Sequence, residues 1–141
     1  MNSVSFEIPG EPIGQGRPRA AVINGKPRLY TPKKSSDWRA TAQWWMKKAM
    51  GSERPWIGPV ELHIVAYFKP AQALVKKWEK NPHLVVRPAK KPDLDNAAKA
   101  VCDAANSIMF VDDAQVVHLV VQKYYATDGN PRVFIKAREL P

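Results

Sequence analysis

The chain has 141 residues, 45% of them hydrophobic and 25% charged, so it can bury roughly two thirds of its unfolded surface around one core. Lysine and arginine number 22 against 13 aspartates and glutamates, a net charge of +9 at pH 7, which favours a polyanion such as nucleic acid as partner. No stretch approaches the ~20 apolar residues of a membrane span, and no signal peptide is evident. We therefore expect a single cytoplasmic domain over residues 1–141, away from membranes.

The first third of the chain predicts a strand, a hairpin and a helix. Apolar residues alternate from Ser3 to Pro9, as in a half-buried strand. Residues 19–30 predict a hairpin with Asn24-Gly25 as its turn. The cations on or beside this hairpin are either solvated or contact phosphates. Thr31-Pro32 then predicts a helix start.

That helix should run to about Met50. Spacings of three and four residues indicate which side chains pack on the sheet: Trp38, Ala42, Trp45, Met46 and Ala49. Trp44 lies about 100° from Trp45 on a helical wheel. It therefore lies either at the edge of the core or in a contact with another subunit.

The middle of the chain predicts a second strand and a basic excursion. Val60 to Phe68 alternates, with His63 on the polar side. Residues 69–91 are basic, punctuated by proline and longer than the usual connection. They include one short helical pattern before Asn81-Pro82. The excursion is either a DNA-gripping arm or a solvated loop.

The last part predicts a helix and two strands. Residues 95–107 form the helix, with a narrow apolar stripe that starts at Leu94, which we expect to point into the core. Cys102 lies among alanines and is expected to be a small buried residue. Residues 116–125 and 132–137 form strands that we expect to pair as a hairpin. The fold class expected is α/β (α+β), a single domain with a mixed, mostly antiparallel sheet of about four to five strands and two main helices.

Four carboxylates, Asp93, Asp95, Asp112 and Asp113, lie within about twenty residues of this basic chain. One of them can serve as a helix cap, where the dipole contributes about 0.3–1 kcal/mol. Two carboxylates about 4 Å apart repel by roughly 4 kcal/mol at an effective dielectric near 20. A converged cluster would therefore need a cation. An all-oxygen set points to Mg²⁺, with Mn²⁺ as a substitute.

A divalent ion on carboxylates within a basic surface suits phosphodiester hydrolysis. Lys99 lies one turn from a carboxylate on either side, Asp95 and Asp103. It either supplies positive charge to the developing phosphorane or forms a surface ion pair. The histidines His63, His83 and His118 are scattered without metal-ligand spacing, so we expect no zinc site.

Several segments together resemble the RusA-type Holliday junction resolvases. The specific part is Lys91-Pro92-Asp93-Leu94-Asp95-Asn96, then Lys99 and Asp103, then Asp112-Asp113-Ala114-Gln115-Val116-Val117. Weaker matches are Phe6 to Gly10, Gly16 to Arg19 and Tyr30 to Lys33. The resemblance implies a small homodimeric endonuclease that binds four-way DNA junctions in recombination and repair and nicks two opposed strands symmetrically with Mg²⁺.

The resemblance also implies roles for individual residues. Asp93, Asp95 and Asp113 would be the metal-binding and catalytic acids, with Lys99 as the catalytic lysine and with Asp103 and Asp112 in support. The cations expected to contact DNA are Arg17, Arg19, Lys33, Lys34, Lys76, Lys77, Arg87, Lys90 and Lys91. Two equivalent nicks favour a two-fold homodimer. The alternatives are a non-catalytic DNA-binding accessory protein and a nuclease for other branched nucleic acids.

Overall fold

The computed structural model describes residues 2–15, 19–30 and 33–141. The predicted helix start at Thr31-Pro32 and the DNA contact at Arg17 lie outside these residues. The described elements are, in chain order, β1 (Ser3–Pro9), β2 (Arg19–Ile23), β3 (Lys26–Tyr30), α1 (Lys33–Met50), β4 (Val60–Phe68), α2 (Gln72–Lys80), α3 (Leu94–Ala105), the 3₁₀ turn η1 (Asp113–Gln115), β5 (Val116–Tyr125) and β6 (Arg132–Glu139).

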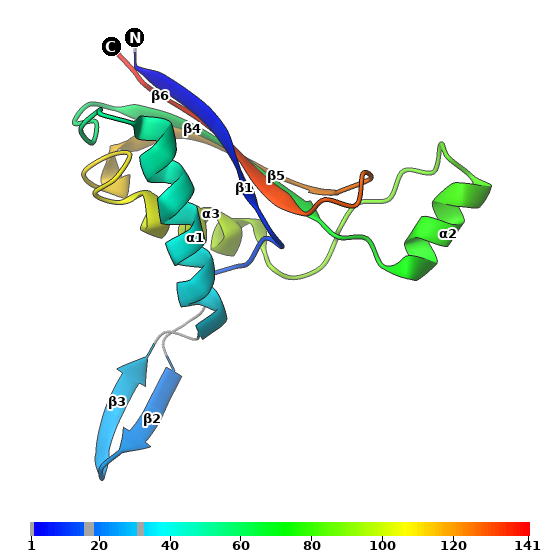
Figure 1. Cartoon of the computed structure of the whole chain (residues 1–141), viewed down its shortest axis with the longest axis horizontal. Helices are drawn as coiled ribbons and strands as arrows, with labels where there is room; N and C mark the ends of the chain where they lie inside the picture. Colours follow the sequence, from blue (N-terminus) through cyan, green and yellow to red (C-terminus); the bar gives the residue numbers. More distant parts are fainter. Residues whose placement is uncertain (1, 16–18, 31–32) are drawn as a thin grey trace.

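A mixed four-stranded sheet in the order β1-β6-β4-β5 forms the centre of the molecule, as Figure 1 shows. β4 pairs with β5 in parallel, whereas β6 pairs antiparallel with both β4 and β1. β2 and β3 form a separate two-stranded sheet. Its turn residues Asn24 and Gly25 have φ of 53° and 74°, the positive values that a two-residue hairpin turn requires. The predicted fold class and the predicted N-terminal hairpin are confirmed.

The predicted hairpin between the last two strands is wrong. The backbone N–H of Ala126 donates to the carbonyl of Phe68 at 2.7 Å, so the chain leaving β5 passes the end of β4. β6 then enters between β4 and β1, where Ile135 lies opposite both Ile64 and Phe6. In this central position β6 forms hydrogen bonds with a strand on each side and buries its alternate residues. At the edge of the sheet beside β5 it would pair on one side only.

α1 and α3 cover one face of the sheet (Figure 1), and the core lies between these layers. β4 alternates along its length between buried and half-buried residues, as predicted. Small residues of α3 let it approach α1 closely, and its Cys102 is buried as expected. The largest fully buried side chains are Phe110, Ile8, Met46, Leu62, Ile64, Met109 and Ile135.

Two large apolar side chains lie outside the core. Trp44 is 57% exposed and meets the edge of Trp45 with ring centroids 4.9 Å apart, so it does not belong to the core. Leu94 is 41% exposed rather than buried. It is the first residue of α3, and side chains on a helix tilt toward its N-terminus, so Leu94 projects beyond the turns that pack on α1. None of the described helices is long and apolar enough to span a membrane.

Candidate functional site

Residues from distant parts of the chain contact the segment that leads into α3 and hold it in place. The Lys123 ammonium of β5 donates to the carbonyls of Lys90 at 2.7 Å and Pro92 at 3.0 Å. A Cβ at Gly14 would lie 2.8 Å from the Cβ of Pro92, so only glycine fits this crossing. The entry to α3 is therefore fixed by residues that the sequence did not single out.

Asp93 occupies the N-cap position of α3 without acting as a cap. Its backbone is extended, and its side chain makes no capping hydrogen bond. Its carboxylate lies 3.6 Å from the Lys91 ammonium, and both side chains are exposed. Asp95 follows in the first turn, where its Oδ1 accepts from the N–H of Asn96 at 3.0 Å. Capping by Asp93 therefore does not explain this pair of acids.

Lys99 pairs with only one of the two carboxylates that flank it on the helix. Its ammonium lies 3.5 Å from Asp103, which also lies 3.9 Å from the guanidinium of Arg39 on α1. Asp103 is the least exposed of these three side chains. It therefore links α1 to Lys99, while the ammonium of Lys99 stays accessible from solvent.

The neighbours Asp112 and Asp113 have different surroundings. Asp112 accepts from the N–H of Ala114 at 3.0 Å and forms a capping box with Gln115. The Gln115 amide in turn donates to the carbonyls of Trp56 and Gly58 at 2.8 and 2.9 Å. Asp112 and Gln115 thus build the turn. Asp113 is its first residue, and its carboxylate takes no part in the capping box.

Asp113 lies beside α3. The turn η1 contacts that helix, and the negative charges of Asp113 and Asp103 add to burial, the larger cause, in raising the pKa of Cys102 to about 11. Asp93, Asp95 and Asp113 are not, however, among the described trios whose ligand atoms all lie within 4.8 Å of one another. Asp113 is thus placed near Cys102 of α3, and it forms no closed trio with Asp93 and Asp95 in the part of the chain that the structure describes.

The predicted DNA-contacting residues are spread over several parts of the fold. Lys33 and Lys34 begin α1, and Lys34 lines a cavity with Lys91 and Asn96 beside the entry to α3. Lys76 and Lys77 are exposed on α2. Arg19 is in β2, where only its backbone is described.

The basic excursion is fastened to the end of β5 by aromatic contacts. Trp78 of α2 meets Tyr125 with centroids 6.2 Å apart, and its indole N–H donates to the Leu84 carbonyl at 3.0 Å. Arg87 and Lys90 each lie 5.8 Å from a ring centroid, that of Tyr124 and Tyr125 respectively. In Figure 1 α2 stands away from the layer formed by α1 and α3. The excursion is thus an anchored arm.

The structure also assembles a group that sequence reasoning missed. His63 and His118, distant in sequence, meet Glu61 because β4 and β5 pair in parallel. His63 and His118 are thus close in three dimensions although they are distant in sequence. No sequence spacing indicates this group, since it depends on which strands are neighbours.

Comparison with known proteins gives two matches. The family model described as Endodeoxyribonuclease RusA matches residues 9–138. A relative from Bacillus subtilis (strain 168), named "Uncharacterized protein YqaN", is 37% identical over 147 residues, covering 99% of each chain. The family match spans the acidic residues of α3 and η1 and the basic arm.

Proposed function

We propose that this chain, which belongs to the RusA endodeoxyribonuclease family, resolves four-way DNA junctions by hydrolysing one phosphodiester in each of two opposed strands. The observation that carries the proposal is the placement of Asp113 beside α3. Asp93 is the N-cap residue of this helix, Asp95 lies in its first turn, and Lys99 lies one turn further along. This placement supports a site in which these acids and Lys99 act together on a basic protein.

The donor set fits a hard divalent cation. Asp93, Asp95 and Asp113 offer only carboxylate oxygens, which Mg²⁺ and Mn²⁺ prefer, and the Asp93 carboxylate is not engaged as a cap. These three residues would hold the ion. When bound, such an ion lowers the pKa of a water ligand and polarises the scissile phosphate.

Lys99 supplies the fixed positive charge of this site. Asp103 holds the ammonium at 3.5 Å and is itself held by Arg39, which limits the positions that Lys99 samples. A cation placed in advance beside the phosphate stabilises the charge that develops as the water attacks. Lys99 therefore acts on the reacting phosphate, and Asp103 positions Lys99.

The cations around the site grip the DNA backbone. Lys34 and Lys91 line one cavity at the entry to α3, and α2 carries Lys76 and Lys77 on an arm anchored through Trp78. Contacts of this kind with phosphates fix the position of DNA without reading sequence. Such phosphate contacts favour a DNA substrate that is recognised by its shape.

Two equivalent nicks in one junction are most simply made by two equivalent sites, so we infer that the active form is a two-fold homodimer. Sedimentation at the concentrations used for cleavage should give a dimer mass. A monomer with full junction activity would overturn this inference.

A synthetic four-way junction and a matched flap, each labelled on one strand at a time, test the function. With Mg²⁺ the protein should nick the junction at symmetric positions in opposed strands and leave the flap intact, while EDTA should abolish nicking. Junction binding without cleavage, with Mg²⁺ or Mn²⁺, would support the accessory-protein alternative. Preferential flap cleavage would identify a nuclease for other branched DNA.

A further inference from the structure

We infer that Glu61, His63 and His118 form a second metal site, selective for a transition-metal ion of the Zn²⁺ class and separate from the carboxylates around α3. The three residues lie on the face of the sheet opposite α1 and α3, on the neighbouring strands β4 and β5. This inference does not depend on the proposed nuclease activity.

The distances within this group suit one small ion. Glu61 Oε1 lies 3.0 Å from His63 Nε2 and 3.7 Å from His118 Nδ1, and all three ligand atoms lie within 4.8 Å of one another. In a tetrahedral zinc site, bonds near 2.0–2.1 Å place neighbouring ligand atoms about 3.3–3.4 Å apart. The two measured separations bracket that value, so modest side-chain rotations are enough to bind an ion.

A β-bulge places His118 in this group. Val60 pairs with Val116, but the next residue, Glu61, pairs with His118, so Val117 is the extra residue. Without the bulge Val117 would stand opposite Glu61. Bulges commonly redirect a side chain in this way. The strand irregularity therefore completes the set of ligands.

Arg138 orients the carboxylate. Its Nε donates to Glu61 Oε2 at 2.6 Å, which leaves Oε1 directed at the two imidazoles. A hydrogen-bonded partner that fixes a ligand in this way is typical of protein metal sites.

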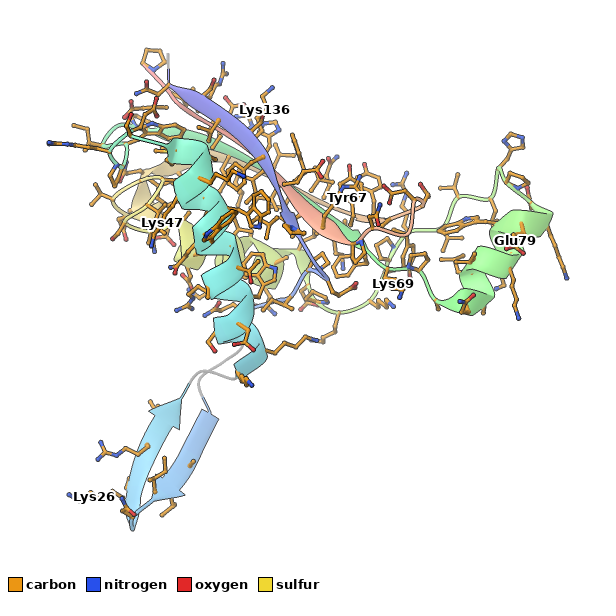
Figure 2. The ribbon with its side chains drawn as sticks, in the orientation of Figure 1. Lys26, Lys47, Tyr67, Lys69, Glu79 and Lys136 are labelled. Carbon is orange, nitrogen blue, oxygen red and sulfur yellow. The ribbon has the colours of Figure 1, made fainter. Side chains whose placement is uncertain are left out.

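The surrounding charge selects the kind of ion. Lys136, which lies opposite His63 on β6 and is labelled in Figure 2, lines the same cavity as Glu61, His63 and Arg138. The positive charges of Lys136 and Arg138 weaken the binding of any cation that is held by electrostatic attraction alone. Imidazole nitrogens bind Zn²⁺, Co²⁺ and Ni²⁺ strongly, whereas Mg²⁺ prefers oxygen. The site therefore excludes the ion proposed for the nuclease reaction.

Two titrations in excess Mg²⁺ test this site. Co²⁺ binding is followed by visible absorption, and Zn²⁺ binding is followed by calorimetry. We expect one ion per chain, with affinity at least ten-fold weaker in His63→Gln and in His118→Gln. His83→Gln, which changes an exposed histidine outside the group, is the matched control and should bind like wild type. Zn²⁺ should also raise the melting temperature of wild type but not of His63→Gln.

Three results would overturn the inference: no saturable binding in wild type, equal weakening in His83→Gln, or binding that survives in both His63→Gln and His118→Gln. Loss of binding in Asp113→Asn would likewise overturn it, because that ion would belong to the acidic site. Melting curves of every variant in EDTA show that each is folded, so that lost binding reports on the ligands.

Discussion

At the scale of single residues, the two adjacent aspartates at η1 have separable roles. Asp112 accepts from the N–H of Ala114 and shares a capping box with Gln115, whereas the carboxylate of Asp113 takes no part in that box. The sequence shows two identical residues side by side. Only the resemblance to a family ranked Asp113 above Asp112 as a ligand, and the turn geometry supplies a physical reason for that ranking.

Removing the cap should cost stability without removing the acid beside it. We expect Asp112→Ala to lower the free energy of unfolding by about 1 kcal/mol, since the N–H of Ala114 loses its acceptor. Asp112→Asn should stay close to wild type, because asparagine caps equally well. Urea denaturation measures both. Equal stability of Asp112→Ala and wild type would show that the cap has no energetic role.

Cys102 gives a prediction about pH. Burial is the main cause that raises the pKa of its thiol from an ordinary 9.0 to about 11. Between these values the unfolded chain has lost the thiol proton while the folded chain keeps it, so the free energy of unfolding falls as pH rises, by about 1.4 kcal/mol per unit at most. Below pH 9 the thiol is protonated in both states, so its contribution to the free energy of unfolding does not change with pH.

Denaturation of wild type and Cys102→Ala from pH 8 to pH 11 isolates that effect. The stability difference between the two proteins should shrink above pH 9, because alanine cannot titrate. Parallel profiles across the whole range would mean that the thiol is not held protonated by the fold.

At the scale of elements, Gln115 joins η1 to the segment before β4. Its amide donates to the carbonyls of Trp56 and Gly58. Gln115→Glu replaces that donor by a carboxylate facing two carbonyls, so we expect a loss of roughly 2–3 kcal/mol in the free energy of unfolding. Gln122→Glu, on an exposed residue of β5, should change stability little. A similar loss in both variants would point to charge rather than to the lost hydrogen bonds.

The elements also show what the sequence could and could not predict. Alternation along β1 and β4 and the Asn24-Gly25 turn are local signals, and the structure confirms them. Strand order is not local: no periodicity shows that β6 enters between β1 and β4. The proximity of His63 and His118 could not be predicted for the same reason, because it depends on which strands are neighbours. Leu94 is exposed because the side chain of a helix's first residue tilts toward the N-terminus.

At the scale of the whole molecule, the acidic region around α3 and the arm that carries α2 should act on different steps. We propose that the arm's lysines contact phosphates. The double variant Lys76→Gln/Lys77→Gln should then bind the junction more weakly, and the slope of log K against log salt concentration should fall by about 2 in magnitude. Lys136→Gln, on β6 and outside the arm, is the control. Equal salt dependence in wild type and the double variant would remove the arm from the DNA interface.

We propose that Asp113 completes, with Asp93 and Asp95, an acidic site that cuts junction DNA. Single-turnover cleavage of a four-way junction in Mg²⁺ by Asp113→Asn and Asp112→Asn tests it most directly. Both substitutions remove one negative charge, at adjacent positions. We predict that Asp113→Asn binds the junction but cuts it at least 100-fold more slowly, about 2.7 kcal/mol in the barrier, while Asp112→Asn cuts within a few-fold of wild type. Full cleavage by Asp113→Asn would contradict the account.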